Sequence, residues 1–323
     1  MALTINHQTN DISNATGTII VNGVVVGGDN GPKGYGSRGV FGGGDVTAGN
    51  TIDYITISTT GNATDFGDLS AAVYNLAATT NGTRGVFGGG QLVSNNSNIV
   101  TIEYITIAST GNATDFGDLT LARGGMAATT NVTRGVFGGG YNRDGSSRSN
   151  VIDYITIATT GNATDFGDLT VVRMDLAAMG DGTYGLFGGG SGSDGSSTNA
   201  IDYITIASTG NATDFGDLTV ARNRVAAVGS DTRGVFGGGN GNSDVMDYVT
   251  IATPGNATDF GNLTVARNAL GATTDGARGV FGGGYSNARI DVLDYITIAS
   301  TGNATDFGNL TVARNRLAGT SGT

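Results

Sequence analysis

Short runs in which hydrophobic and polar residues alternate fill most of the chain, and glycine or asparagine interrupts them at close intervals. This two-residue period is that of a β-strand, and β-branched runs such as Ile152 to Ile157 disfavour helix. In the run from Ile102 to Thr110 both alternating sets carry hydrophobic side chains, which suits a strand covered on both faces of its sheet. We therefore predict an all-β protein of short strands and tight turns.

The same pattern returns six times along the chain. The heptapeptide GNATDFG begins at Gly61, Gly111, Gly161, Gly210, Gly255 and Gly302. Glycine triplets begin at positions 42, 88, 138, 188, 237 and 282, so successive repeats are 45 to 50 residues apart. Repeats of this length are typical of propeller blades. Six copies of one motif indicate architecture, because one substrate meets one set of catalytic groups.

Each repeat has room for four strands. In the second repeat the predicted strands are 76–80, 84–90, 102–110 and 113–119, with Asn81-Gly82 at the first turn. An Asn-Gly pair supplies the positive φ angles that a tight hairpin requires. Four strands of about five to seven residues, with their turns, fill about 48 residues. The sequence therefore predicts one four-stranded blade per repeat and six blades in all.

The two ends of the repeat array predict how the ring closes. After the last GNATDFG the chain adds one further strand, Leu317 to Thr320, without a second. The first RGVFGGG, at Arg38, lacks the strand that precedes every other copy. We predict that Leu317 to Thr320 pairs with Val40 to Gly43, so that residues 38–323 form a closed ring without an open sheet edge.

Residues 1–37 are predicted to be a separate attachment segment. Residues Leu3 to Asn6 alternate, Thr18 to Val26 can form a strand pair around Asn22-Gly23, and the glycine-rich stretch Gly27 to Gly36 is interpreted as a linker. A hairpin this small cannot bury a core of its own. We therefore expect it to dock onto another protein.

Composition excludes several classes of function. A net charge of −11 disfavours nucleic acid and anionic membranes as partners, and no apolar run is long enough to predict membrane insertion. The chain has no cysteine and one histidine, His7, ahead of the ring, which excludes thiolate chemistry and a Ser-His-Asp triad within it. The repeated carboxylates share one local sequence, so none is set apart as an acid or a base. We therefore predict no enzymatic activity and no cofactor. We also predict no metal, since the single GGxGxD run at Gly189 to Asp194 lacks the tandem copies of calcium-binding β-rolls.

Two charged series recur once per repeat and are expected to pair with each other. One is Asp65, Asp115, Asp165, Asp214, Asp259 and Asp306. The other is Arg38, Arg84, Arg134, Arg233 and Arg278, with Tyr184 in the remaining place. Charges repeated in this way are expected to form ion pairs between strands or blades, not a functional site.

The stretch between each glycine triplet and the third strand differs in every repeat. In a propeller these stretches and the fourth-to-first connections surround one mouth of the central channel, and diverse loops on a uniform frame are typical of a binding surface. Unconstrained drift of the loops is the alternative. Their Asn, Ser, Gly, Tyr and Arg residues can hydrogen-bond hydroxyl-rich ligands and stack on sugar rings. The candidate ligand-binding residues are Tyr141, Arg143, Asp144, Arg148, Arg222, Arg224, Tyr285 and Arg289.

The repeat resembles that of kelch-type β-propellers. The likeness lies in consecutive glycines that end the second strand, as at Gly88 to Gly90, in a tyrosine-bearing third strand, and in an arginine before the next blade at Arg123, Arg173, Arg222, Arg267 and Arg314. The chain departs from that pattern in having no tryptophan, and Phe66 and its counterparts stand where kelch repeats usually carry one. The N-terminal segment and the repeat DYITIASTGNATDFGDLTVAR are also similar to virion and tail-appendage proteins of tailed bacteriophages.

These resemblances lead to three hypotheses. In the first, the protein is a phage virion appendage, made in the host cytoplasm, whose N-terminal segment binds other virion proteins and whose loops bind a host-surface glycan or protein. In the second, it is a purely structural decoration or a neck or tail component that binds other virion subunits. In the third, it is a bacterial kelch-like protein-interaction scaffold. Assembly into a homo-oligomer through the N-terminal strands would suit either virion role.

Overall fold

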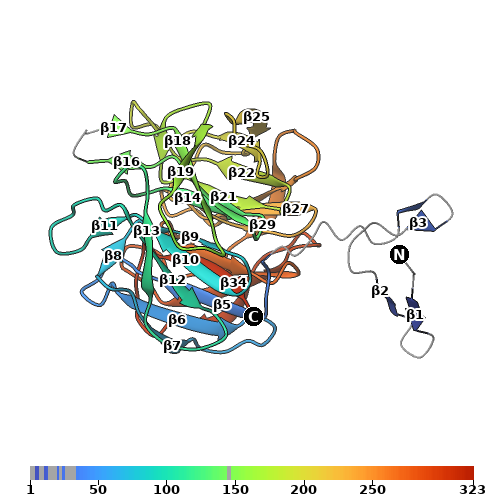
Figure 1. Ribbon diagram of the computed structural model, residues 1–323, viewed down its shortest axis with the longest axis horizontal. Coiled ribbons are helices and arrows are strands. Elements are labelled where there is room, and N and C mark those ends of the chain that lie inside the picture. Colours follow the sequence, from blue (N-terminus) through green and yellow to red (C-terminus); the bar gives the residue numbers. More distant parts are fainter. Residues whose placement is uncertain (1–3, 7–10, 14–19, 22–23, 26–33, 144–146) are drawn as a thin grey trace.

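Six antiparallel four-stranded sheets surround a central channel (Figure 1). The computed structural model describes residues 4–6, 11–13, 20–21, 24–25, 34–143 and 147–323, and these residues contain strands and turns but no helix. The predicted all-β, six-bladed propeller is confirmed. We number the blades 1 to 6 along the chain, and name their strands from the channel outward as inner, second, third and outer.

The blades repeat one strand order. The inner strands are β34 (Ala318–Gly322) in blade 1, then β9 (Ala77–Thr80), β14 (Ala127–Thr130), β21 (Ala177–Gly180), β26 (Ala226–Gly229) and β30 (Gly271–Thr274). The second strands are β5 (Arg38–Gly42), β10 (Arg84–Gly88), β15 (Arg134–Gly138), β22 (Tyr184–Gly188), β27 (Arg233–Gly237) and β31 (Arg278–Gly282). The third strands are β6 (Thr51–Thr56), β12 (Thr101–Thr106), β18 (Val151–Thr156), β24 (Ala200–Thr205), β28 (Val245–Thr250) and β32 (Val292–Thr297). The outer strands are β7 (Thr64–Asp68), β13 (Thr114–Asp118), β19 (Thr164–Asp168), β25 (Thr213–Asp217), β29 (Thr258–Asn262) and β33 (Thr305–Asn309).

Blade 1 is built from both ends of the ring. The inner strand β34 pairs antiparallel with β5, with Ala318 opposite Gly42 and Thr320 opposite Val40. This is the closure that the unmatched strands predict, and it pairs β5 on both sides, so the second strand of blade 1 has no free edge.

Two small hairpins lie ahead of the ring. Strand β1 (Thr4–Asn6) pairs with β2 (Asp11–Ser13), and β3 (Ile20–Val21) pairs with β4 (Val24–Val25). Within the described residues neither hairpin joins a blade. Of the predicted linker, Gly27 to Gly36, residues 27–33 lie outside the described residues.

The glycine triplets let neighbouring blades approach closely. A Cβ atom on Gly42 would lie 2.7 Å from the ring of Phe87, which comes from the second strand of the next blade. The first glycine of every other triplet faces the corresponding phenylalanine at 2.5–2.9 Å in the same way. Because carbon atoms do not approach to such distances, any larger residue there would push two blades apart.

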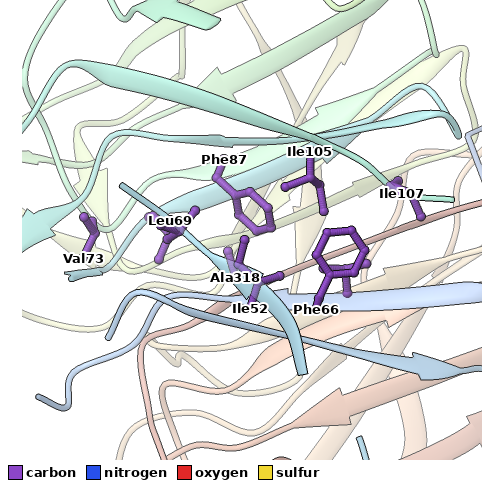
Figure 2. Packing of buried hydrophobic residues seen from close by; sticks show 10 residues of the cluster. Ile52, Phe66, Leu69, Val73, Phe87, Ile105, Ile107 and Ala318 are labelled. Carbon is purple, nitrogen blue, oxygen red and sulfur yellow. The ribbon is translucent and has the colours of Figure 1, made fainter. Parts of the chain in front are cut away.

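The hydrophobic core is divided into six clusters, each between two adjacent blades. In the cluster between blades 1 and 2, Phe87 lies beside Ile52 and Ala318 of blade 1 and Ile105 of its own blade (Figure 2). Both faces of each sheet are therefore covered, which explains why both alternating sets of the third strand are hydrophobic.

The heptapeptide GNATDFG latches each blade onto the blade before it. In the second copy, the N–H groups of Gly111 and Ala113 donate to the carbonyls of Phe66 and Asp68 on outer strand β7, each at 2.8 Å. The Asp68 N–H in turn donates to Asn112 Oδ1 at 3.0 Å. The same bond to asparagine joins Asp118 to Asn162, Asp168 to Asn211, Asp217 to Asn256, Asn262 to Asn303 and Asn309 to Asn62. The motif therefore recurs six times because the ring has six seams.

The two predicted charged series do not pair with each other. Arg38 lies over the ring of Tyr54 with 4.6 Å between guanidinium carbon and ring centroid, and donates to the Ile107 carbonyl of the next blade at 2.7 Å. Arg84, Arg134, Arg233 and Arg278 repeat this cation–π contact over Tyr104, Tyr154, Tyr248 and Tyr295. The Asp65 series is exposed on the outer strands, and among the described residues it forms no ion pair.

The buried ion pairs use a different carboxylate, on the third strand. Arg173, in the connection leading into blade 4, lies 2.9 Å from Asp202 of β24, and neither side chain is exposed to solvent. Equivalent pairs join Arg123 to Asp153, Arg222 to Asp247, Arg267 to Asp294 and Arg314 to Asp53. At the remaining seam Val73 replaces the arginine and Glu103 replaces the aspartate. Burial lowers the pKa of all five arginines, and the facing carboxylates oppose that shift.

Candidate binding site on the loop face

The variable loops and the fourth-to-first connections meet on one face of the ring, which we term the loop face. In blade 2, β8 (Val73–Tyr74) of the incoming connection pairs with β11 (Gln91–Leu92) of the variable loop. In blade 4, β20 (Arg173–Met174) pairs with β23 (Ser191–Gly192). Single bridges between Gly124 and Tyr141 and between Asn268 and Tyr285 repeat this arrangement. Each variable loop is thus held by main-chain bonds to the connection beside it.

The candidate arginines of the loops link neighbouring blades. The main-chain N–H of Arg143 donates to Asn98 Oδ1 of blade 2 at 2.7 Å. Arg148 donates to the Ser193 carbonyl at 3.3 Å and to Ser191 Oγ at 3.2 Å, both in the loop of blade 4. Arg289 of blade 6 lies 3.3 Å from Asp45 of blade 1, with both side chains partly exposed. These contacts join the loops into a rim.

The aromatic candidates also lie on this rim. Tyr141 is partly buried in β16 (Tyr141–Asn142), which pairs with β17 (Ser147–Arg148). Tyr285 is 40 % exposed, which leaves its ring free to contact a ligand. Asp144 lies outside the described residues. Asp194 of the single GGxGxD run caps a turn, accepting a hydrogen bond from the Ser196 N–H at 2.9 Å.

Arg222 is not a surface residue, which corrects the sequence-based prediction. Its guanidinium is 2 % exposed and donates to Asp247 and to the carbonyls of Gly238 and Val245. A side chain engaged in this way belongs to the seam between blades. Arg224, two residues later, is 40 % exposed and lies at the channel mouth.

The channel mouth on the loop face is a closed ring of main-chain hydrogen bonds. Six equivalent residues, one from each connection, donate their N–H to the carbonyl of the preceding one at 2.6–2.9 Å. All six have φ between 56° and 68°. They are Asn75, Gly125, Asp175, Arg224, Ala269 and Arg316. A left-handed conformation is unfavourable for residues other than glycine by about 1–2 kcal/mol, and here each such residue completes a bond of the ring.

Five of the six mouth residues are absent from the sequence-based candidates, and three of those five, Asn75, Asp175 and Arg316, have polar side chains. A signal for them exists in the repeats: the position two residues before the inner strand differs in nearly every copy. That position supplies all the side chains of the ring, so its variation changes the chemistry of the mouth without changing its backbone.

The opposite end of the channel, the base, is filled by the end of the predicted linker. Gly34 packs on Thr80, and Gly36 packs on the main chain of Gly322. Between them Tyr35 enters the channel, and its hydroxyl donates to the Gly180 carbonyl at 3.0 Å. Residues 34–36 are therefore part of the propeller and not a free linker.

Tyr35 completes a pattern of hydroxyl groups at the base. The hydroxyls of Thr80, Ser321 and Thr274 donate to the inner-strand carbonyls of blades 1, 6 and 5 at 2.6–3.2 Å. In blade 5 the equivalent residue is Gly229, which has no hydroxyl to offer the Gly180 carbonyl. Tyr35 supplies that donor.

The surroundings of Tyr35 change its ionisation. Burial, and then the carboxylates Asp231 and Asp181, raise the pKa of Tyr35 above its ordinary value of 10.0. The phenol is therefore neutral and able to donate its hydrogen bond at physiological pH.

Comparison with known protein families and with curated protein sequences finds no match to the chain. In the described part of the chain, no three or more His, Cys, Asp or Glu side chains are grouped to hold a metal ion. No helix among these residues could span a membrane.

Proposed function

We propose that the protein is a non-enzymatic virion appendage of a tailed bacteriophage that binds a host-surface ligand, expected to be a glycan, through its loop face. The observation that carries this proposal is that the two ends of the channel differ. The variable loops lie at one end of the channel, while Tyr35 holds the chain at the other. N-terminal attachment to other virion proteins would leave the loop face directed away from the particle.

The loop face has the composition and rigidity that a glycan site needs. Its rim offers guanidinium, amide and hydroxyl groups together with the exposed ring of Tyr285, and contacts between blades fix the loops. Rigid loops lose little conformational entropy on binding. We also propose that the chain is related to kelch-type propellers and to phage proteins, on the basis of the glycine, tyrosine and arginine positions of the repeat.

The outer wall, formed by the six outer strands, favours this role over that of a purely structural subunit. Its exposed positions are threonine and aspartate, as at Thr64 and Asp65. Among the described residues the exposed large hydrophobic side chains are Val171, Val220 and Tyr285. A stable subunit interface would present a larger apolar patch.

A binding experiment on the full chain tests the proposal. Wild type is applied to a glycan array and to a panel of aquatic bacterial cells, beside a variant with residues 141–150 and 285–290 replaced by Gly-Ser. The control carries Asp115→Asn and Asp165→Asn on the outer wall. We expect saturable binding by wild type and control and none by the loop variant. If the loop variant binds as well as wild type, the proposal is contradicted. It is also contradicted if wild type binds no glycan or cell and yet assembles into virus particles; that result would favour the purely structural role.

A further inference from the structure

The channel mouth contains a small cavity with a volume of about 70 Å³. It is lined by all six residues of the hydrogen-bonded ring and by the hydrophobic residue that follows each of them, such as Leu76 and Leu176. A buried water molecule needs roughly 10–15 Å³, so the mouth can hold a larger group. Four of the ring residues are polar, and they supply the polar side chains of this lining.

The two arginines that line this cavity have few side-chain partners. Arg224 has one weak contact, from Nε to Asp175 at 3.4 Å. Arg316 lies over the ring of Tyr74, with 5.4 Å between guanidinium carbon and ring centroid. No other hydrogen bond of either side chain occurs within the described residues. Arg222 differs, since all its bonds are to buried acceptors of the seam.

The geometry holds these groups at the mouth. The main chain of both residues is locked into the ring, with N–H···O distances of 2.6 Å for each. The Tyr74 ring contacts the Arg316 guanidinium, and the Tyr74 hydroxyl donates a 2.7 Å hydrogen bond to Asn96 Oδ1. The main chain that carries the two arginines is therefore fixed before any ligand arrives, which lowers the entropy lost on binding.

The available donors select an anionic group. The six ring amides already donate to carbonyls, so a ligand in the mouth meets side-chain donors only. Two arginines and one aspartate give the mouth a local charge of about +1, and a guanidinium binds a carboxylate through two parallel hydrogen bonds. The chain as a whole carries −11, which disfavours polyanions and leaves a single carboxylate on an otherwise neutral ligand as the best fit.

We propose that the channel mouth binds the carboxylate of an acidic saccharide, such as a uronic acid residue, with Arg224 and Arg316 as its donors. This inference rests on the proposed function, because it names the chemical class of glycan that the loop face binds. The rim would contact the neutral remainder of the saccharide, and the mouth would require its acidic group.

Two experiments separate this inference from the wider proposal. On the glycan array, wild type is compared with Arg224→Gln, Arg316→Gln and the outer-wall control Asp115→Asn. Binding to uronate-bearing glycans is expected to weaken at least tenfold in each mouth variant and less than threefold in the control. Equal binding of acidic glycans and their carboxyl-reduced forms would overturn the carboxylate site and leave the adhesin standing.

Sodium glucuronate alone is the second probe. It is titrated into the full chain while the arginine Nε–H signals are followed by NMR, with methyl glucoside as the neutral control. Saturable shifts are expected for Arg224 and Arg316 with glucuronate only. Shifts confined to other arginines, or none at millimolar glucuronate, would overturn the inference even if the array shows glycan binding.

Discussion

The buried arginine–aspartate pairs allow a prediction about stability, and the one seam that has valine and glutamate instead suggests a compensating change. Arg173 bonds to Asp202 at 2.9 Å and also donates to the carbonyls of Ala200 at 2.7 Å and Phe187 at 3.0 Å. Replacing Arg173 with valine leaves an unpaired buried carboxylate and two carbonyls without this donor. Breaking a buried pair from one side is destabilising by about 3–5 kcal/mol. At roughly 2–4 °C per kcal/mol, Arg173→Val should lower Tm by about 6–20 °C.

The seam between blades 1 and 2 suggests a partial rescue. There Val73 takes the place of the arginine, and the longer Glu103 accepts from the Ser70 N–H at 3.1 Å. Adding Asp202→Glu to Arg173→Val should therefore restore about 1–2 kcal/mol, because the longer carboxylate fills part of the vacated space and keeps its main-chain donor. Urea unfolding followed by circular dichroism measures both variants. A single variant within about 1 kcal/mol of wild type, or a double variant less stable than the single one, would refute the reasoning.

Two further predictions concern the GNATDFG contacts between blades and the base of the channel. Gly117→Ala should destabilise the ring by at least about 1–3 kcal/mol, because its Cβ would lie 2.5 Å from the Gly161 carbonyl oxygen. Gly111→Ala also has positive φ but meets nothing within 4 Å, so a larger loss in this control by thermal unfolding would contradict the steric account. Tyr35→Phe should lose about 0.5–1.5 kcal/mol at neutral pH, since the Gly180 carbonyl loses its donor. Because folding raises the pKa of Tyr35, its contribution is present below pH 10 and falls as pH rises above that value, so the difference between wild type and Tyr35→Phe should shrink in alkaline urea unfolding. A difference that grows with pH would show that the phenol is not neutral in the folded ring.

The strands, the number of blades and the closure could be predicted because each depends on local pattern. Asn-Gly turns, glycine triplets and alternating runs act within a few residues, and identical repeats multiply the signal sixfold. The pairing of charges could not be predicted in this way. Asp153 and Asp165 lie directly opposite each other on β18 and β19, yet the first is buried and the second exposed. The connection from the preceding blade, which carries Thr120 and Arg123, packs against Asp153 and so decides which carboxylate faces the arginine.

The sequence could predict which face of the ring carries the candidate site, but not which residues form it. Arg222 and Arg224 are two positions apart in one connection; arginine recurs at the first position in five repeats and the second position varies, but this pattern alone does not say which side chain is buried. The left-handed conformation of Arg224 separates them, and that conformation depends on hydrogen bonds to two other blades. The role of Tyr35 likewise depends on glycines at positions 180 and 229, far away in the chain.

The central claim is that the loop face, and not the outer wall, contacts the host surface. The chain has no cysteine, so a single one can be placed at exposed Ser193 on the loop face or at exposed Thr164 on the outer wall and coupled to a bulky polyethylene glycol. Binding of both conjugates to cells recognised by the wild type is then measured. The account predicts that the conjugate at position 193 loses binding while that at position 164 keeps it. Loss at 164 with retention at 193 would contradict it.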